Sequence, residues 1–478
     1  MPIEYPDSTF GAAAPPSVES SLLADLSSAG VAFDVDGPTR ADHGRDWWPL
    51  TIRDVANGLV PQWPGVVVRP NTTTQVSQTL EIASRHLIAV TAQGGRSGVV
   101  GGAAARDGTI ALDLTGLNRI VSVDEVSGTV RVQAGVFGPD LEDHVQALGW
   151  TVGHFPQSFD LATVGGWIAC RGAGQYSNRY GKIEDIVRSL TVVLASGEVI
   201  DVGARGPRRA LGPDLAQLFV GSEGVLGVIT EATLVMHPKA PFEARAAFRF
   251  SSFEEGLSTC RKILQRDARP AVLRLYDEVE SERNFEVEGC ALVVLDEGDE
   301  LLVTATMAIV ADECSTADPL DRSTVQSWLD HRNNVDALAP LWQKGFVVDT
   351  IEVAGPWSTL GPMHRSVTAA LSEIPEMLVV SVHQSHAYLD GACLYFTFAG
   401  RPSGDPTAFY REAWDRASAT VLESGGDLSH HHGIGRNRAR FVAAALGSAY
   451  PVLDGIKTLL DPHDVMNPGV LGLGGAPW

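Results

Sequence analysis

Two features of the sequence predict an α+β protein with more than one domain. The chain has 478 residues, which is about three times the usual domain size of about 100–150 residues. Residues 66–235 alternate short apolar strands with amphipathic helical segments, whereas longer strands alternate with helices after residue 242. The first pattern is typical of a mixed domain, and the second predicts a largely antiparallel sheet with helices on one face.

The first half is expected to contain short strands and two helices. Residues 72–86 place Val76, Leu80 and Ala83 at helical spacing behind capping threonines. A second helix at 138–148 would bury Leu141, Val145 and Leu148 on one face and stop at Gly149. Strands are expected at 66–70, 87–90, 109–114, 120–123 and 129–134, with two more at 189–200 around a Ser-Gly turn. Before them, an Ala/Pro-rich start is predicted to be mobile, and the aromatic segment 40–54 is predicted to dock on the rest of the protein.

The second half begins where the segment HPKAPF at 237–242 interrupts the pattern. One helix is expected where Phe253, Leu257, Cys260 and Leu264 recur at helical spacing, and another at 405–425. Strands are expected at 242–250, 270–277, 289–296, 346–353, 378–383 and 392–400.

Composition excludes several classes of protein. A net charge of −22 repels nucleic acid and anionic membrane surfaces, and 44% hydrophobic residues indicate a globular chain. Five cysteines without a C-x-x-C pair predict free thiols in a reducing compartment. The acidic, proline-rich start is unlike a secretory signal, and no apolar stretch approaches about 20 residues. We therefore expect a cytoplasmic protein with a small-molecule substrate, no nucleic-acid partner and no membrane insertion.

Glycine-rich stretches supply the main functional signal of the first half. The segment TAQGGRSGVVGG at 91–102 follows a strand, and its glycines let backbone N–H groups approach an anion such as a pyrophosphate. Its spacing is not the G-x-G-x-x-G of a Rossmann unit. Further glycine-bearing stretches at 156–174, 178–187 and 221–234 predict one extended site.

Together these motifs resemble the FAD-binding module of the vanillyl-alcohol-oxidase type flavoenzymes, from about Arg40 to Gly469. Within that superfamily the chain is most similar to the alkyldihydroxyacetonephosphate synthase family and its bacterial look-alikes. The strings that carry this similarity are ATVGGW at 162–167, Arg171 to Gly174, YGKIEDIV at 180–187, EGVLGVIT at 223–230, ACLYF at 392–396 and SHHHGIG at 429–435.

The resemblance implies a PCMH-type FAD module of two subdomains and a cap domain with an antiparallel sheet and flanking helices. The expected boundaries are an N-terminal segment at 1–57, the FAD module at 58–238, the cap at 239–440 and a segment at 441–478 that returns to the FAD module. It also implies non-covalent FAD, because Val99 and Val100 stand where relatives with covalent flavin have a histidine. A homodimer is a further expectation.

The resemblance also implies which residues hold FAD. The pyrophosphate would be wrapped by Gln93, Gly94, Gly95, Arg96 and Ser97. The flavin and ribityl chain would be lined by Pro156, Gln157, Ser158, Thr163, Gly165, Gly166, Ala169, Arg171 and Gly172. The nucleotide end would be contacted by Glu223, Gly224, Gly227, Val228 and Ile229.

Three consecutive histidines, His430, His431 and His432, are candidate proton-transfer groups because imidazole exchanges protons near neutral pH. Adjacent residues of an extended chain point to opposite faces, so the three do not readily converge on one metal ion. The metal-binding segments of related D-2-hydroxy-acid dehydrogenases also differ from residues 390–395 and 429–433 here. We therefore expect no metal.

The similarity places the histidines and Tyr395 beside the flavin, and Tyr395 is the expected acid or base. Its phenol has an ordinary pKa of about 10, which a nearby imidazolium or the flavin would lower. Arg274 matches a family arginine beside the substrate, where it would hold a carboxylate or an oxyanion. A strand tyrosine that only packs, a hydrogen-bonded histidine turn and a salt bridge in the cap are the structural alternatives.

One departure from the family bears on the substrate. Leu338 stands near the place of an arginine that grips substrate phosphate, and Arg332 or Lys344 could replace that cation. The leading hypothesis is FAD-dependent oxidation of a hydroxyl-bearing carbon, in an alcohol or a 2-hydroxy acid, with transfer to flavin N5. The alternative is synthase chemistry, in which a flavin N5 adduct exchanges the acyl group of acyl-dihydroxyacetone phosphate for a fatty alcohol. A third hypothesis is a protein that kept the scaffold without catalysis.

Overall fold

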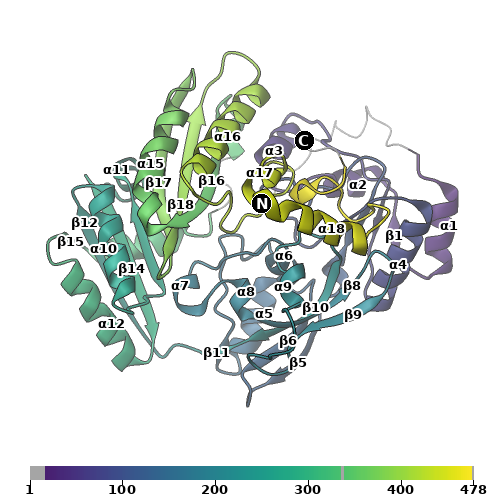
Figure 1. The fold of residues 1–478 in the computed structure, drawn as a ribbon, viewed down its shortest axis with the longest axis horizontal. Helices are drawn as coiled ribbons and strands as arrows, with labels where there is room; N and C mark the ends of the chain where they lie inside the picture. Colours follow the sequence, from purple (N-terminus) through teal and green to yellow (C-terminus); the bar gives the residue numbers. More distant parts are fainter. Residues whose placement is uncertain (1–16, 335–338, 476–478) are drawn as a thin grey trace.

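The computed structural model describes residues 17–334 and 339–475. Leu338 and the Ala/Pro-rich start at residues 1–16 lie outside this part of the chain. The structure has an α+β fold in which two adjoining sheets form the first half and one large sheet forms the second (Figure 1).

The first sheet has the strand order β1-β2-β4-β3, in which β2, β4 and β3 are parallel and β1 is antiparallel. Its strands are β1 (Phe33–Asp34), β2 (Val66–Val68), β3 (Val90–Gln93) and β4 (Ile110–Asp113). The accompanying helices are α1 (Ser20–Ser28), α2 (Gly37–His43), α3 (Pro49–Ala56) and α4 (Thr73–His86). The hydroxyl of Thr72 caps α4 by accepting from the backbone N–H of Gln75, as the threonine run predicts.

The second sheet is antiparallel, with the order β5-β6-β10-β8-β9. Its strands are β5 (Ile120–Asp124), β6 (Thr129–Gln133), β8 (Val187–Val193), β9 (Val199–Gly203) and β10 (Val228–Val235), and β7 (Trp150–Thr151) pairs with β11 (His237–Pro238) beside it. The helices here are α5 (Gly138–Gln146), α6 (Val164–Ala169), α7 (Ser177–Tyr180), α8 (Ile183–Ile186) and α9 (Ala216–Phe219).

A seven-stranded antiparallel sheet forms the cap domain, in the order β15-β12-β14-β13-β17-β18-β16. Its strands are β12 (Phe242–Phe250), β13 (Val272–Tyr276), β14 (Cys290–Gly298), β15 (Asp318–Leu320), β16 (Val347–Pro356), β17 (Met377–Ala387) and β18 (Gly391–Gly400). Helices α10 (Phe253–Gln265), α12 (Glu300–Glu313), α15 (Trp357–Ser372) and α16 (Pro406–Glu423) cover one face (Figure 1). The predicted antiparallel sheet is confirmed.

The other face of this sheet carries two helices that the sequence analysis did not anticipate. Helices α11 (Glu278–Phe285) and α13 (Ser323–His331) pack against it through Phe285, Val325 and Trp328. A short helix, α14 (Ala339–Gln343), lies nearby on α3. The prediction of helices on one face only is therefore incomplete. The second face is the one that turns toward the first half of the chain.

The C-terminal segment packs against the first half of the chain. Helices α17 (Val442–Leu446) and α18 (Tyr450–Leu460) follow the cap, and α18 packs on the core of the second sheet through Tyr450, Leu453 and Ile456. In Figure 1 this yellow segment lies across the first half of the chain. Met466 then bridges to Val90 of β3.

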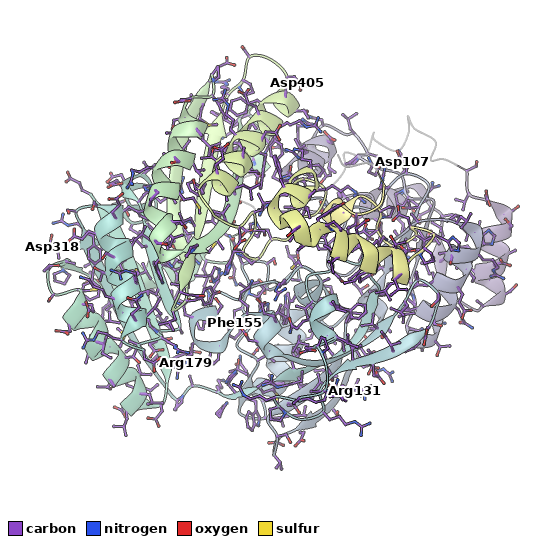
Figure 2. The ribbon with its side chains drawn as sticks, viewed as in Figure 1. Asp107, Arg131, Phe155, Arg179, Asp318 and Asp405 are labelled. Atoms are coloured by element: carbon purple, nitrogen blue, oxygen red, sulfur yellow. The ribbon has the colours of Figure 1, made fainter. Side chains whose placement is uncertain are left out.

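The two halves are joined by buried polar contacts. The indole of Trp48 donates to the Tyr410 hydroxyl at 2.9 Å, so the aromatic segment 40–54 does dock, and it docks on the cap. From α7, Arg179 forms an ion pair of 3.0 Å with the fully buried Asp296 of β14. Arg179 and Phe155 lie where the two parts meet (Figure 2).

Two local boundaries differ from the sequence prediction. Strand β3 begins at Val90, because Leu87 adopts the left-handed conformation (φ 54°) that ends α4. Helix α5 ends at Gln146, before Gly149, and Leu148 is 42% exposed instead of buried. Among residues 17–334 and 339–475, no helix is both long and apolar enough to span a membrane.

Candidate active site

A cavity of about 900 Å³ lies between the two halves of the chain. Such a volume is at the upper end of ordinary ligand pockets. All but two of the site residues predicted from the sequence line it: Gln93, Gly94, Gly95, Arg96, Ser97, Pro156, Gln157, Ser158, Thr163, Gly165, Gly166, Ala169, Gly172, Glu223, Gly224, Gly227, Val228, Ile229, Arg274, Tyr395, His431 and His432. Segments that are distant in sequence therefore converge on one site.

The two exceptions are Arg171 and His430. Arg171 pairs with Glu184 at 3.3 Å, and its side chain does not line the cavity. His430 lies behind His431, 9% exposed, and is also absent from the cavity wall. Neither side chain is placed to touch a ligand in the cavity directly.

The first glycine loop presents free backbone donors. The N–H groups of Gly95, Arg96 and Ser97 donate to none of the residues that the structure describes. Arg96 adopts a left-handed φ of 54°, which helps successive N–H groups to point inward as an anion nest. This loop therefore fits the pyrophosphate of FAD.

The same loop is packed tightly against the second glycine stretch. A Cβ on Gly95 would overlap the carbonyl oxygen of Leu161, and one on Gly94 would overlap the Thr163 hydroxyl. Glycine is required here because two backbone segments meet, and not only because a ligand approaches. Thr163 also caps α6, where its hydroxyl accepts from the N–H of Gly166.

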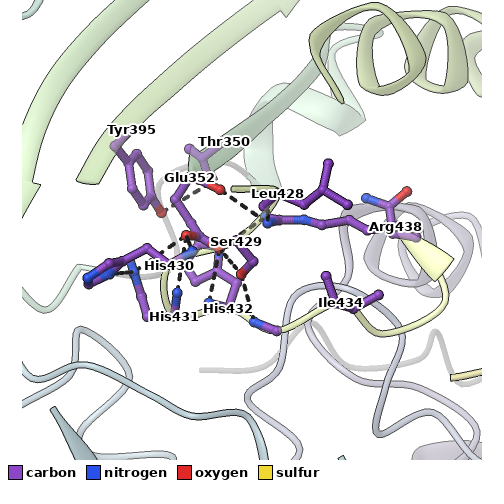
Figure 3. Close-up of polar contacts among 12 residues, drawn as sticks. Thr350, Glu352, Tyr395, Leu428, Ser429, His430, His431, His432, Ile434 and Arg438 are labelled. Carbon is purple, nitrogen blue, oxygen red and sulfur yellow. Dashed lines mark hydrogen bonds and ion pairs between the residues drawn. The ribbon is translucent and has the colours of Figure 1, made fainter. Parts of the chain in front are cut away.

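The histidine turn is held by two carboxylates, the buried Glu352 of the cap and the half-buried Glu223 of the first half. From β16, Glu352 accepts hydrogen bonds from the backbone N–H groups of His430, His431 and His432 (Figure 3). From the first half, Glu223 accepts from the N–H groups of Ile434 and Gly435, each at 2.7 Å. The turn is thus fixed against both the cap sheet and the glycine loops.

Burial keeps the imidazoles neutral. It lowers the pKa of His430 to about 3 and that of His432 to about 4, and it lowers the pKa of His431 well below its usual range. His431 and His432, the two members of the turn that line the cavity, therefore each have a bare ring nitrogen that can accept a proton from a bound substrate at neutral pH.

Tyr395 differs from the expectation in the direction of its pKa shift. Burial raises the pKa of its phenol, and no imidazolium is present to lower it, because the neighbouring imidazoles are neutral. The Tyr395 oxygen accepts a hydrogen bond of 3.1 Å from Thr350, which leaves its own proton to donate. Tyr395 is consequently a proton donor at neutral pH and not a ready base.

Adjacent histidines do converge, contrary to the expectation from an extended chain. Atoms of Glu352, Cys393, His430 and His431 that could ligate a metal lie within 4.8 Å of one another. The Glu352 carboxylate is already occupied by backbone donors and by Arg438, and burial raises the pKa of the Cys393 thiol. This donor set is a poor match to a metal, because Glu352 could bind one only with a free carboxylate and Cys393 only as a thiolate.

A hydrogen-bonded chain positions Arg274 in the cavity. The Nδ1 of His383 donates to Glu280 at 2.8 Å, so the Nε2 of His383 is the acceptor for an Arg274 N–H at 2.9 Å. His383 also stacks on Tyr395, with ring centroids 4.8 Å apart. These contacts place the guanidinium and the phenol on one wall.

A second guanidinium, from Arg332 at the C-terminal end of α13, lies on the same wall. Arg274 and Arg332 lie over the Trp328 ring, with 5.5 and 5.7 Å between each Cζ and the ring centroid. Arg332 donates to the Tyr176 hydroxyl, and neither arginine pairs with a carboxylate among the residues described. Lys344 does not line the cavity. Two cations without carboxylate partners therefore face the same space.

Sequence reasoning missed Glu352, Glu280, His383 and His386 in the site. A glutamate between Ile351 and Val353 in the strand VVDTIEV was a signal for Glu352, because a carboxylate is rarely placed between buried apolar residues without a partner. His386 gave no such signal, because a register shift between Gln384 and His386 in β17 brings it to the cavity face beside Ser385.

The arrangement of glycine loops, cavity and proton-transfer groups fits an FAD-dependent enzyme, and the comparisons show the family to which the chain belongs. Residues 64–203 match the FAD binding domain family, and residues 239–471 match the C-terminal domain of the FAD linked oxidases. The chain belongs to this family of FAD-dependent enzymes, and the expected cofactor class is confirmed.

Individual relatives span most of the chain. An uncharacterized FAD-linked oxidoreductase of Escherichia coli, YgcU, is 30% identical over 431 residues, covering 85% of this chain and 89% of the relative. The alkyldihydroxyacetonephosphate synthase of Caenorhabditis elegans is 27% identical, covering 87% of this chain and 77% of its own.

Solved structures show the same fold. One of alkyldihydroxyacetonephosphate synthase superposes with a TM-score of 0.79 at 24% identity, covering 95% of this chain and 87% of that one. p-Cresol methylhydroxylase superposes with a TM-score of 0.77 at 14% identity, covering 99% of both chains. The predicted fold of the vanillyl-alcohol-oxidase type is confirmed.

Proposed function

We propose that the protein oxidises a hydroxyl-bearing carbon, in an alcohol or a 2-hydroxy acid, with non-covalently bound FAD. One observation carries this proposal: a single cavity joins the glycine loops to Tyr395, His431 and His432 and to two arginines without carboxylate partners. The bound flavin supplies a hydride acceptor at N5. The remaining chemistry falls to side chains of the cap.

The cap residues have complementary roles in this proposal. A neutral imidazole of His431 or His432 takes the hydroxyl proton of the substrate, while Tyr395 donates a hydrogen bond to the same oxygen. Arg274 and Arg332 hold a carboxylate of a 2-hydroxy acid, since a guanidinium matches its planar shape. The His383 and Glu280 chain keeps Arg274 in place.

Synthase chemistry, the acyl-for-alkyl exchange on dihydroxyacetone phosphate, is the second candidate. The observation that favours it is Arg332, which lines the cavity and offers a cation for a phosphate. The similarity to alkyldihydroxyacetonephosphate synthases points the same way.

An anaerobic titration tests both candidates. The FAD-loaded protein is mixed with glycolate, D-lactate, longer 2-hydroxy acids and primary alcohols, and flavin absorbance near 450 nm is followed. Persistent bleaching by one of these compounds supports oxidation. Exchange of acid for alcohol on an acylated dihydroxyacetone phosphate, without an electron acceptor, supports the synthase instead.

Non-covalent binding has its own test. Val99 and Val100 offer no nucleophile to attach a flavin, so acid precipitation of the protein should release all of the FAD into solution. Flavin retained in the pellet would contradict this. A cytoplasmic location and a homodimer remain predictions, and light scattering during gel filtration tests the second.

A further inference from the structure

We propose that Tyr388 is the exit of a proton relay that leads from the cavity through His431 and His430 to the surface of the protein. The inference rests on the proposed oxidation, because that reaction releases a hydroxyl proton in the cavity between the two halves of the chain. Tyr388 follows β17, does not line the cavity, and has no role in the chemistry described above.

The relay begins at His431, which lines the cavity and contacts His430. The Nδ1 atoms of His431 and His430 are 3.0 Å apart, and the Nε2 of His430 is 3.0 Å from the Tyr388 hydroxyl. The Nε2 of His431 has no hydrogen bond to any residue in the described ranges, so it is available to a substrate in the cavity. His430 thus bridges the cavity wall and Tyr388.

The donors and acceptors of this chain alternate correctly. A neutral imidazole has one N–H and one bare nitrogen, so His431 can donate from Nδ1 to His430, which then donates from Nε2 to Tyr388. When the Nε2 of His431 takes the hydroxyl proton of the substrate, His431 passes its Nδ1 proton to His430, His430 passes its Nε2 proton to the Tyr388 oxygen, and Tyr388 passes its hydroxyl proton to solvent water. The hydride leaves the same carbon for FAD, so the electron pair does not travel along the relay.

A second branch reaches the same hydroxyl. Ser177 lies 2.8 Å from the Nδ1 of His386 and 3.2 Å from the Tyr388 oxygen. His386 also lines the cavity, and its ring stacks on His430 at 4.9 Å. Both branches therefore converge on Tyr388, which is half-buried and is followed by the exposed Leu389 and Asp390.

Charged groups around the chain oppose the storage of a proton inside it. Lys182 donates to the backbone oxygen of His430, and its charge disfavours an imidazolium there. The charge of Arg274 likewise lowers the pKa of His386. The Glu352 carboxylate acts in the opposite direction, because its negative charge raises the pKa of His430 and His431. Glu184 and Asp185 place negative charge near Tyr388, which attracts a proton to the outer end. The Cys393 thiol is a further titratable group near Tyr388, beside His430.

The functional test is Tyr388→Phe, with Tyr450→Phe as a matched control. Tyr450→Phe also removes one hydrogen bond, the one from the Tyr450 hydroxyl to the Gly472 carbonyl oxygen, but residue 450 lies on α18, away from the relay. With the compound that bleaches the wild-type flavin, we expect the rate of anaerobic reduction to fall at least about 10-fold in Tyr388→Phe. Added imidazole buffer should restore the rate, and FAD content should be unchanged.

The outcomes separate the relay from the proposed function. Bleaching of wild type at the same rate as Tyr388→Phe overturns the relay while the oxidation stands. A slow variant that imidazole does not rescue also overturns it, since a structural defect would behave in that way. No bleaching of wild type by any alcohol or hydroxy acid overturns the oxidation itself.

A readout without substrate completes the test. In protein labelled with ¹⁵N-histidine, the Nε2 resonance of His430, assigned with His430→Gln, should shift in Tyr388→Phe and stay in place in Tyr450→Phe. An unchanged resonance means that the hydrogen bond to Tyr388 is absent, and the relay is then wrong whatever the substrate.

Discussion

Arg438 and Glu352 form an ion pair of 3.1 Å in which both side chains are fully buried. The same arginine donates to the backbone oxygens of Glu352 and Leu428, and its guanidinium lies over Trp414. Its charge is a principal reason why the pKa of Glu352 is lowered despite burial. The carboxylate that organises the histidine turn therefore depends on one partner charge from the segment after that turn.

Replacing Glu352 by Gln should destabilise the protein strongly. The change leaves the buried Arg438 without a counter-charge, which costs about 3–5 kcal/mol in comparable sites. Urea unfolding measures the loss. The exposed Glu125→Gln serves as control, and we expect it to change stability by less than about 0.5 kcal/mol. A loss below about 1 kcal/mol for Glu352→Gln would show that the pair is not the anchor of the turn.

Tyr395→Phe should retain FAD but turn over slowly. Removal of the hydroxyl takes away the hydrogen bond to the substrate oxygen, and we expect the rate of flavin reduction to fall about 10²-fold. Stopped-flow absorbance measures the rate, and release of FAD on denaturation measures occupancy. Wild-type turnover in this variant would remove Tyr395 from the reaction.

Gly95→Ala should reduce FAD retention. The new methyl group would overlap the Leu161 carbonyl and force the two glycine stretches apart. Gly206→Ala is the control, because nothing lies within 4 Å of its added Cβ. The flavin-to-protein absorbance ratio after gel filtration compares them, and equal ratios would mean that the loops do not hold FAD in the way described.

Stability should fall as the pH decreases below 6.5, in part because of His154. This ring is fully buried against Trp167 without a hydrogen-bond partner in the described chain, and burial lowers its pKa from 6.5 to about 3. Between these values the unfolded chain binds a proton that the folded protein does not. Stability from this residue is therefore complete above pH 6.5 and decreases by up to about 1.4 kcal/mol per pH unit below it.

His154→Phe isolates this contribution, since the apolar ring has a similar shape and does not titrate. We expect its melting temperature to depend less on pH between 6.5 and 4 than that of the wild type. The exposed His144→Gln should keep the wild-type slope. Identical slopes for wild type and His154→Phe would contradict the assignment.

Arg332→Gln should affect anionic substrates selectively. The change removes one of the two guanidiniums over Trp328, so the KM for a hydroxy acid should rise about 10-fold, as expected for loss of about 1.4 kcal/mol from a charged hydrogen bond. The KM for a neutral alcohol should stay constant. Steady-state kinetics with both classes test this, and an equal rise for both would indicate a loss of packing instead of charge recognition.

The glycine strings, the strand and helix pattern and the SHHHGIG segment together predicted the cofactor class, the antiparallel cap and most of the cavity lining. These features could be predicted because glycine-rich motifs and hydrophobic periods of 2 or 3.6 residues are recognised within short stretches of sequence. The sequence also placed Arg274 and Tyr395 on strands that reach the site.

Only the tertiary structure decided which groups act on those residues. Tyr395 has Glu352 and His383 as its cross-strand neighbours, and a register shift in β17 turns His386 toward the cavity. Strand order, register and bulges join residues that are far apart in sequence, and burial between the domains then sets the direction of each pKa shift. For this reason the sequence could name Tyr395 and the three histidines, but the packing decided that the phenol is a donor and that the imidazoles are neutral.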